Sequence, residues 1–190
     1  MKQSTSCAPS KPKDETLLRL YPTKDELCKA YNPSRQISLT DSQDCHFGSY
    51  PTLADLDATY GAKTSAYWLV PQLLDLSEYC GCRDKLTGAM LKHCAEIIAQ
   101  DCQRLKVTEL MLFFRRFKSG RYGHFYGAVD PLVITEALGT FSRERADAHA
   151  IRDRQEQDPI KNYNEAKEQA ITYEEYLRRN PNACPFKIKP

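Results

Sequence analysis

The residues best suited to chemistry lie between Arg104 and Gly127, where cations alternate with aromatic rings. This stretch holds six Lys or Arg residues against one acid, Glu109. Cations attract phosphates and planar rings stack on bases, so the composition suits a surface that follows a nucleic-acid backbone. Arginine and aromatic residues are also enriched in the energetically important parts of protein interfaces. We expect a nucleic-acid or protein partner to contact Arg115, Arg116, Lys118, Arg121, Tyr122, His124, Phe125 and Tyr126.

The same stretch also has a structural explanation, which the sequence leaves open. Phe114 and Phe117 fall on the inner face of a helix, and cations in a last helical turn suit the helix dipole. The loop GRYGHFYG has glycines that allow close approach of a phosphate, but it matches no phosphate-binding motif. The rings of Tyr122, Phe125 and Tyr126 decide between the two, because rings packed into the core cannot contact a partner.

A metal site and an enzyme site are weaker alternatives. Cys80, Cys82, His93 and Cys94 fall within fifteen residues, but the adjacent His93 and Cys94 point about 100° apart on a helix and cannot easily converge on zinc. His124 could act as an acid or base beside Tyr122 and Tyr126, yet no nucleophile has a base partner. We predict no catalytic residue, resident metal or cofactor, while zinc on Cys80 and Cys82 with His93 or Cys94 stays open.

The net charge, the lengths of the apolar stretches and the cysteine content restrict the class of protein. A formal net charge of +2 over 190 residues does not indicate a globally basic nucleic-acid binder. No stretch approaches the roughly 20 apolar residues that cross a membrane, and the N-terminus has no apolar signal core. Eight cysteines, several of them in apolar helical patterns, favour free thiols in a reducing compartment. We therefore expect a cytoplasmic protein that does not bind a membrane.

The periodicity predicts an all-α fold, a compact array of about five helices with a Gly/aromatic loop at 120–129. Thr52, Thr87 and Asp130-Pro131 supply helix starts. We expect residues 1–50 to be largely disordered or loosely ordered, 51–146 to form the helical core, and 147–190 to form a charged helical extension and tail. The helices are predicted at 52–60, 65–79, 88–104, 108–118 and 131–150, with a further helix at 163–179.

Residues 50–146 resemble a family of small uncharacterised proteins of bacterial phages, prophages and conjugative elements. The segments SYPTLADLDATYG and LSEYCGCRDKLT carry this resemblance, and FFRRFKSGRYGHFYGAVDPLVI is its most specific part. The family has no established activity, so the resemblance implies a setting inside a cell that carries a mobile element and assigns no catalytic residue.

Two functions remain open from the sequence. The first is a non-enzymatic accessory protein that contacts DNA or a replication protein, similar at fold level to small helical helicase loaders. The second is a protein-interaction module, an adaptor or inhibitor of a host or phage protein, that uses the same basic and aromatic residues.

Overall fold

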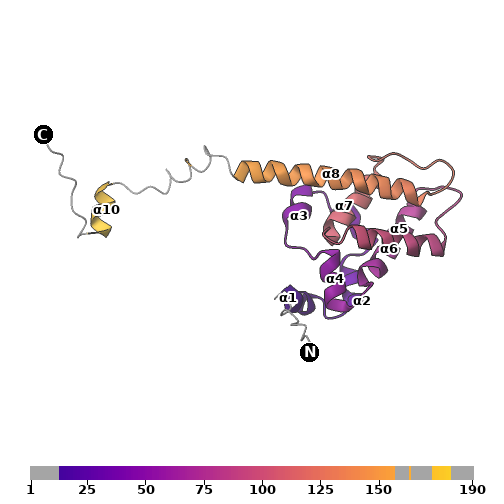
Figure 1. Cartoon of the computed structure of the whole chain (residues 1–190), viewed down its shortest axis with the longest axis horizontal. Coiled ribbons are helices and arrows are strands. Elements are labelled where there is room, and N and C mark those ends of the chain that lie inside the picture. The colour runs from indigo at the N-terminus through magenta and orange to yellow at the C-terminus, as the bar shows by residue number, and fades with distance from the viewer. Residues whose placement is uncertain (1–12, 157–162, 164–172, 181–190) are drawn as a thin grey trace, which may run out of the picture. The chain divides into compact units, whose positions relative to one another are not determined.

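Helices dominate the computed structural model, which describes residues 13–156, 163 and 173–180 (Figure 1). These residues form no strand, only two isolated β-bridges, which confirms the all-α prediction. The elements are α1 (Lys13–Leu20), α2 (Lys24–Ala30), the 3-10 helix η1 (Pro33–Ser38), α3 (Ser42–Phe47), α4 (Leu53–Tyr60), α5 (Thr64–Tyr79), α6 (Gly88–Asp101), α7 (Val107–Lys118), α8 (Pro131–Glu156) and α10 (Tyr173–Arg179).

The predicted helix starts are confirmed by their hydrogen bonds. The hydroxyl of Thr52 accepts from the backbone N–H of Asp55 at 3.2 Å, and Thr87 caps α6 in the same way. The carboxylate of Asp130 accepts from the N–H of Leu132 at 2.8 Å. These side chains satisfy backbone donors that a helix leaves unpaired.

Two boundaries differ from the sequence pattern. The α6 helix ends at Asp101, three residues before the expected position, and Leu105 then lies buried at the turn into α7. The sequence predicts a kink at Pro71 or a helix that starts there. The α5 helix runs from Thr64 through Pro71 to Tyr79, so no new helix starts at this proline, which is exposed and removes one backbone hydrogen bond from the helix.

The α7 helix lies at the centre of the core. Every residue from Val107 to Phe114 is buried, as is Phe117, so this helix has almost no solvent face. It packs against η1, α3 and α5, while α5 also packs against α4 and α6. Phe113 meets Phe141 of α8 edge-on, with ring centroids 5.7 Å apart. Burial of eight consecutive residues means that other elements enclose the first two turns of α7 on all sides.

The expectation that the folded core begins near Pro51 is wrong. Leu27 and Cys45 are buried in the same core as α5 and α7, and Gln36 and His46 are buried as well. Gln36 Nε2 donates to Oε1 of Gln72 at 2.6 Å. Polar side chains that pair inside the core look like a linker in the sequence, because composition alone does not show their partners.

His46 joins α3 to α7 and is buried, whereas its polar sequence surroundings predict an exposed ring. Its Nδ1 lies 2.9 Å from Oε1 of Glu109, and both side chains are buried. Oε2 of Glu109 accepts from the backbone N–H of Lys106 at 2.9 Å, and Nζ of Lys106 donates to the carbonyls of His46 and Gly48. Glu109 therefore contacts the imidazole of His46 and the N-terminus of α7, while the ammonium of Lys106 pairs with backbone carbonyls at the end of α3.

Residues from Glu144 onward form a separate unit and carry helix-stabilising charge pairs. Arg152 pairs with Glu156 and Arg179 with Glu175, each one helical turn apart. Of the predicted helix at 163–179, Tyr163 and Tyr173–Arg179 are described and are helical, and residues 164–172 lie outside the described residues. Of the N-terminal stretch predicted to be disordered, 1–16, residues 13–16 begin α1, and residues 1–12 lie outside the described residues, as does the predicted loose tail at 182–190. Within the described ranges, every helix is too short or too polar to cross a membrane.

Candidate interaction surface

The cations predicted to bind phosphate have other contacts at the end of α7. Lys118 forms an ion pair with Asp75 of α5, and its ammonium lies 5.4 Å from the centre of the Tyr79 ring. The guanidinium of Arg116 lies 5.7 Å from the centre of the Phe141 ring. Arg115 and Arg116 are both half-buried, and Arg121 is exposed. The cluster is thus partly neutralised and partly packed.

Two of the three predicted loop rings pack into the protein. Phe125 stacks on Phe117 with centroids 5.3 Å apart and planes 23° apart. Tyr122 lies against Phe113 at 5.6 Å and near Phe117 at 6.3 Å. Both rings are half-buried at the edge of the core, as the structural explanation of these two residues predicts.

The backbone of the loop is fixed at both ends. Gly120 N–H donates to the Phe117 carbonyl at 2.9 Å, and the N–H of Val129 donates to the Asp84 carbonyl at 2.9 Å. Gly127 has a φ of 80°, a backbone conformation that a side chain would strain. The glycines therefore serve the turn geometry, and the loop is attached to the segment between α5 and α6.

Tyr126 is the loop ring that faces solvent, with 86% of its surface exposed. Its ring lies edge-on to the imidazole of His124, with centroids 5.5 Å apart, and His124 is also exposed. We call Arg121, His124 and Tyr126 the loop surface. These three exposed side chains belong to a loop whose other rings, Tyr122 and Phe125, pack against the core.

A hollow of about 200 Å³ lies beside the loop surface. Tyr79 and Cys80 from the end of α5, Phe117 and Lys118 from α7, and the loop residues His124 and Phe125 help to form it. Sequence reasoning missed the two α5 residues that hold Lys118, namely Asp75 and Tyr79. Their spacing of four places both side chains on one face of a helix, which is the signal that points to them.

The cysteine and histidine residues considered for zinc are divided between different environments. Cys94 is buried in the apolar face of α6, where burial raises the pKa of its thiol to about 11, and its neighbour His93 is exposed. Cys80 and Cys82 are half-buried, and burial raises the pKa of the Cys80 thiol above its usual value. Among the described residues no group of three or more potential ligands converges.

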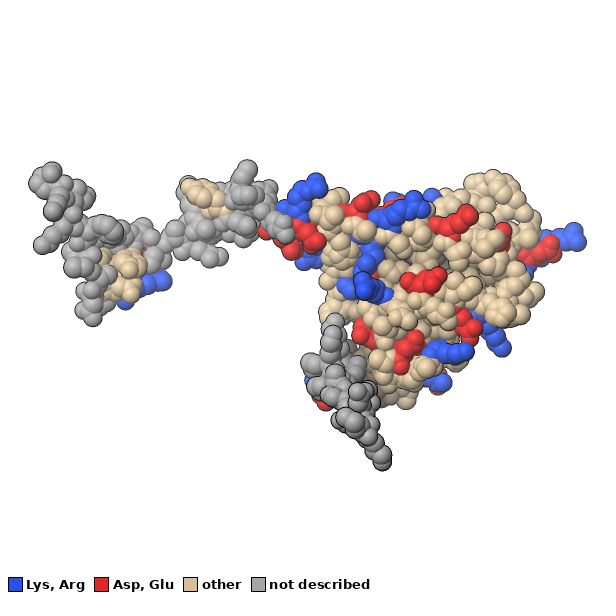
Figure 2. Space-filling view, in the orientation of Figure 1, with Lys and Arg blue, Asp and Glu red and all other residues tan. Residues whose placement is uncertain are grey.

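The charges of the visible face are mixed. Figure 2 shows Lys and Arg side chains interspersed with Asp and Glu, without a single continuous basic region on this face. A nucleic-acid surface normally carries clustered positive charge. Of the eight residues expected at the site, the structure leaves Arg121, His124 and Tyr126 exposed and the other five half-buried.

Comparison with known proteins gives a family and no activity. No curated protein and no solved structure matches the chain. A family model described as a family of unknown function (DUF6633) matches residues 85–182, a stretch that contains α6, α7 and the loop surface. Because this match covers half of the 190 residues, the chain belongs to the DUF6633 family.

Proposed function

We propose that the chain is a non-enzymatic protein-interaction module of a phage or other mobile element, an adaptor or inhibitor that binds a protein through the loop surface. The observation that carries this proposal is the contrast within one loop. Phe125 and Tyr122 anchor it in the core, while Tyr126 stands 86% exposed between them and the start of α8. A rigidly presented tyrosine binds at low entropic cost because little freedom remains to be lost.

Nucleic-acid binding is less well supported as the principal function. A stacking platform needs several exposed rings beside unpaired cations, and here Lys118 is paired with Asp75 while Phe125 and Tyr122 face the core. The mobile-element setting rests on the sequence resemblance. A cytoplasmic location is supported by the cysteines of the described part of the chain, where the thiols of Cys28, Cys45, Cys80, Cys82, Cys94 and Cys102 are free.

Affinity capture with matched tyrosine variants tests the proposal. The wild-type chain, Tyr126→Ala and Tyr67→Ala are immobilised and exposed to nuclease-treated lysate of the host cell. Tyr67 is the control, because it is also exposed (55%) but lies near the start of α5, twelve residues and about 18 Å along the helix from Tyr79. A protein retained by wild type and Tyr67→Ala, and lost with Tyr126→Ala, is the expected result.

Equal retention by all three proteins would contradict a role for the loop surface. Fluorescence anisotropy with labelled oligonucleotides at about 50 and 200 mM salt tests the other function. Salt-sensitive binding that is lost in the Arg115→Ala/Arg116→Ala protein would restore the nucleic-acid function in place of the one proposed.

A further inference from the structure

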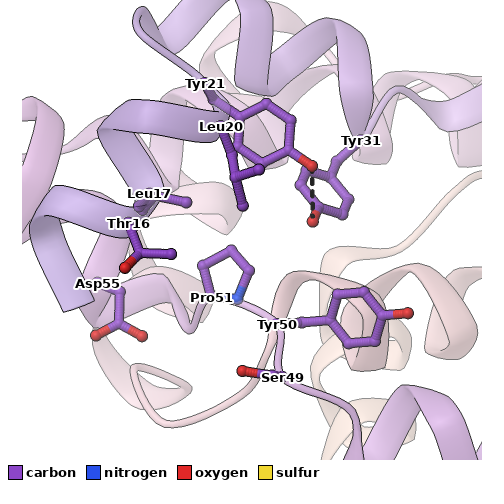
Figure 3. Close-up of a pocket in the computed structure, with 9 residues that line it drawn as sticks. All are labelled: Thr16, Leu17, Leu20, Tyr21, Tyr31, Ser49, Tyr50, Pro51 and Asp55. Atoms are coloured by element: carbon purple, nitrogen blue, oxygen red, sulfur yellow. Dashed lines mark hydrogen bonds between the residues drawn. The ribbon is translucent and has the colours of Figure 1, made fainter.

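A second surface lies apart from the loop, where α1 and the Ser49–Pro51 segment form a cavity of about 400 Å³ (Figure 3). In Figure 1, α1 lies at the opposite end of this part of the chain from the start of α8, which the loop precedes. The volume falls in the range of ligand pockets, roughly 300–1,000 Å³. The cavity also lies outside residues 85–182, the stretch that defines the family match.

Three tyrosine rings line the cavity, and each is fixed by the surrounding structure. Tyr21 and Tyr31 meet edge-on at 5.6 Å, and the Tyr21 hydroxyl donates weakly to that of Tyr31 at 3.4 Å. The hydroxyl of Tyr50 donates to Oδ2 of Asp44 at 2.6 Å. These contacts hold the ring positions before any ligand arrives, which reduces the entropy lost on binding.

The buried part of the protein also fixes the backbone under Tyr31. The Tyr31 carbonyl accepts from Nε1 of Trp68 at 2.9 Å and from Nε2 of Gln72 at 2.8 Å. The Tyr60 hydroxyl donates to the Tyr21 carbonyl at 2.5 Å. Both donors to Tyr31 come from buried side chains of α5, so the core holds the backbone that carries this ring.

The remaining lining combines the apolar Leu17, Leu20 and Pro51 with the hydroxyl side chains of Thr16 and Ser49 and one carboxylate. Figure 3 shows Leu20 of α1 directed toward Pro51, and Leu20 keeps 62% of its surface exposed although it lines the cavity. Asp55 is the one charged side chain of the lining. Its Oδ2 accepts from the backbone N–H and the hydroxyl of Thr52, which holds the carboxylate at the start of α4. The site is therefore mainly aromatic and apolar, with two hydroxyl side chains and one negative charge.

We propose that this tyrosine-lined cavity binds a proline-containing, basic peptide segment of a partner protein. Proline-rich segments hold an extended helix without internal hydrogen bonds and dock into aromatic-lined grooves. The Tyr31 hydroxyl accepts from Tyr21, so its own O–H can donate to a free carbonyl of such a segment. Asp55 complements a Lys or Arg at one end, and an acidic segment would meet an unfavourable charge there. This proposal does not depend on the loop surface.

The test uses the full chain and three synthetic peptides. The probe is acetyl-Pro-Pro-Leu-Pro-Pro-Arg-amide, the second peptide has glycine at every proline, and the third has glutamine in place of arginine. Binding is followed by isothermal titration and by amide chemical shifts. We expect saturable binding of the probe, at least about tenfold weaker binding of the glycine peptide, and a smaller loss for the glutamine peptide.

Two leucines of α1 give a matched pair of variants. Leu20→Lys places a cation in the cavity, whereas Leu18→Lys makes the same charge change at a residue that is also exposed (43%) but does not line it. Because both leucines are exposed, neither variant is expected to unfold the chain, and circular dichroism checks this. We expect Leu20→Lys to weaken the probe at least about tenfold and Leu18→Lys less than about twofold.

Asp55→Asn tests the charge while its amide oxygen can still cap α4. It is expected to weaken the arginine probe and to leave the glutamine peptide unchanged, which isolates the pairwise term. The proposal is overturned by absence of saturable binding or by equal binding to both lysine variants. It is also overturned if the probe binds only after Pro9→Ala and Pro12→Ala, because the chain's own proline-containing segment would then be the occupant.

Discussion

Replacing Glu109 with alanine should destabilise the fold strongly without touching the loop surface. The change removes the 2.9 Å contact to Nδ1 of His46 and the 2.9 Å bond from the Lys106 N–H. The buried imidazole and the N-terminus of α7 each lose the Glu109 oxygen that they contact. Hydrogen bonds to charged groups contribute about 1.5–3 kcal/mol each, and breaking a buried pair typically costs about 3–5 kcal/mol. We expect a loss in the latter range.

Urea denaturation followed by circular dichroism measures this loss in the free energy of unfolding. In thermal denaturation, at about 2–4 °C per kcal/mol for a chain of this size, the melting temperature should fall by about 6–20 °C. Glu109→Gln should cost less, because its amide oxygen can still accept from Lys106. Glu96→Ala is the control, since its partner Lys63 and Glu96 itself are exposed, and it should leave the midpoint unchanged within error. A Glu109→Ala loss below about 1 kcal/mol would refute the stabilising role of the network.

Three further predictions concern the loop, the glycines and the thiols. Phe125→Ala removes the stack on Phe117 and should accelerate hydrogen exchange of the amides at 120–129 while those of α5 stay protected. Gly127→Ala, at a φ of 80°, should destabilise the protein by about 1 kcal/mol. Gly139→Ala lies inside α8 with nothing within 4 Å of the added carbon and should stabilise the protein by about 0.5–1 kcal/mol. Stability changes of the same sign for both variants in urea denaturation would contradict this prediction. Burial raises the pKa of the Cys94 thiol from 9.0 to about 11, so its contribution to stability is complete below pH 9 and is lost as the pH rises through 11. Cys94→Ala should therefore show a smaller fall in melting temperature over that range than wild type.

The candidate site could be located in the sequence but not interpreted there. The pattern of cations and rings at 104–127 correctly marks the end of α7 and the loop. It does not distinguish Phe125, which stacks on the core, from Tyr126, which is exposed. Side chains in an irregular loop follow no fixed period, so their spacing in the sequence does not predict which ring is buried and which is exposed.

In the N-terminal part of the chain, too, the sequence does not predict which residues are buried. Residues 32–50 are polar and turn-rich, which predicts a linker, yet Gln36, Cys45 and His46 are buried. Their partners, Gln72, Thr108 and Glu109, are 36 to 63 residues away. A buried polar group is stable when its partner is present, and the partner becomes visible only when the chain is folded.

The sequence by itself determined the all-α class, the starts of the helices at Thr52, Thr87 and Asp130, and the loop between α7 and α8. These features depend on local chemistry, since caps, glycines and a helical apolar period act over a few residues. The tertiary structure alone decided which cations are neutralised, as with Lys118 and Asp75, which rings are exposed, and that three tyrosines enclose a cavity beside α1. Those features depend on contacts between residues far apart in the chain, whose free energy is set by burial and geometry that no local pattern contains.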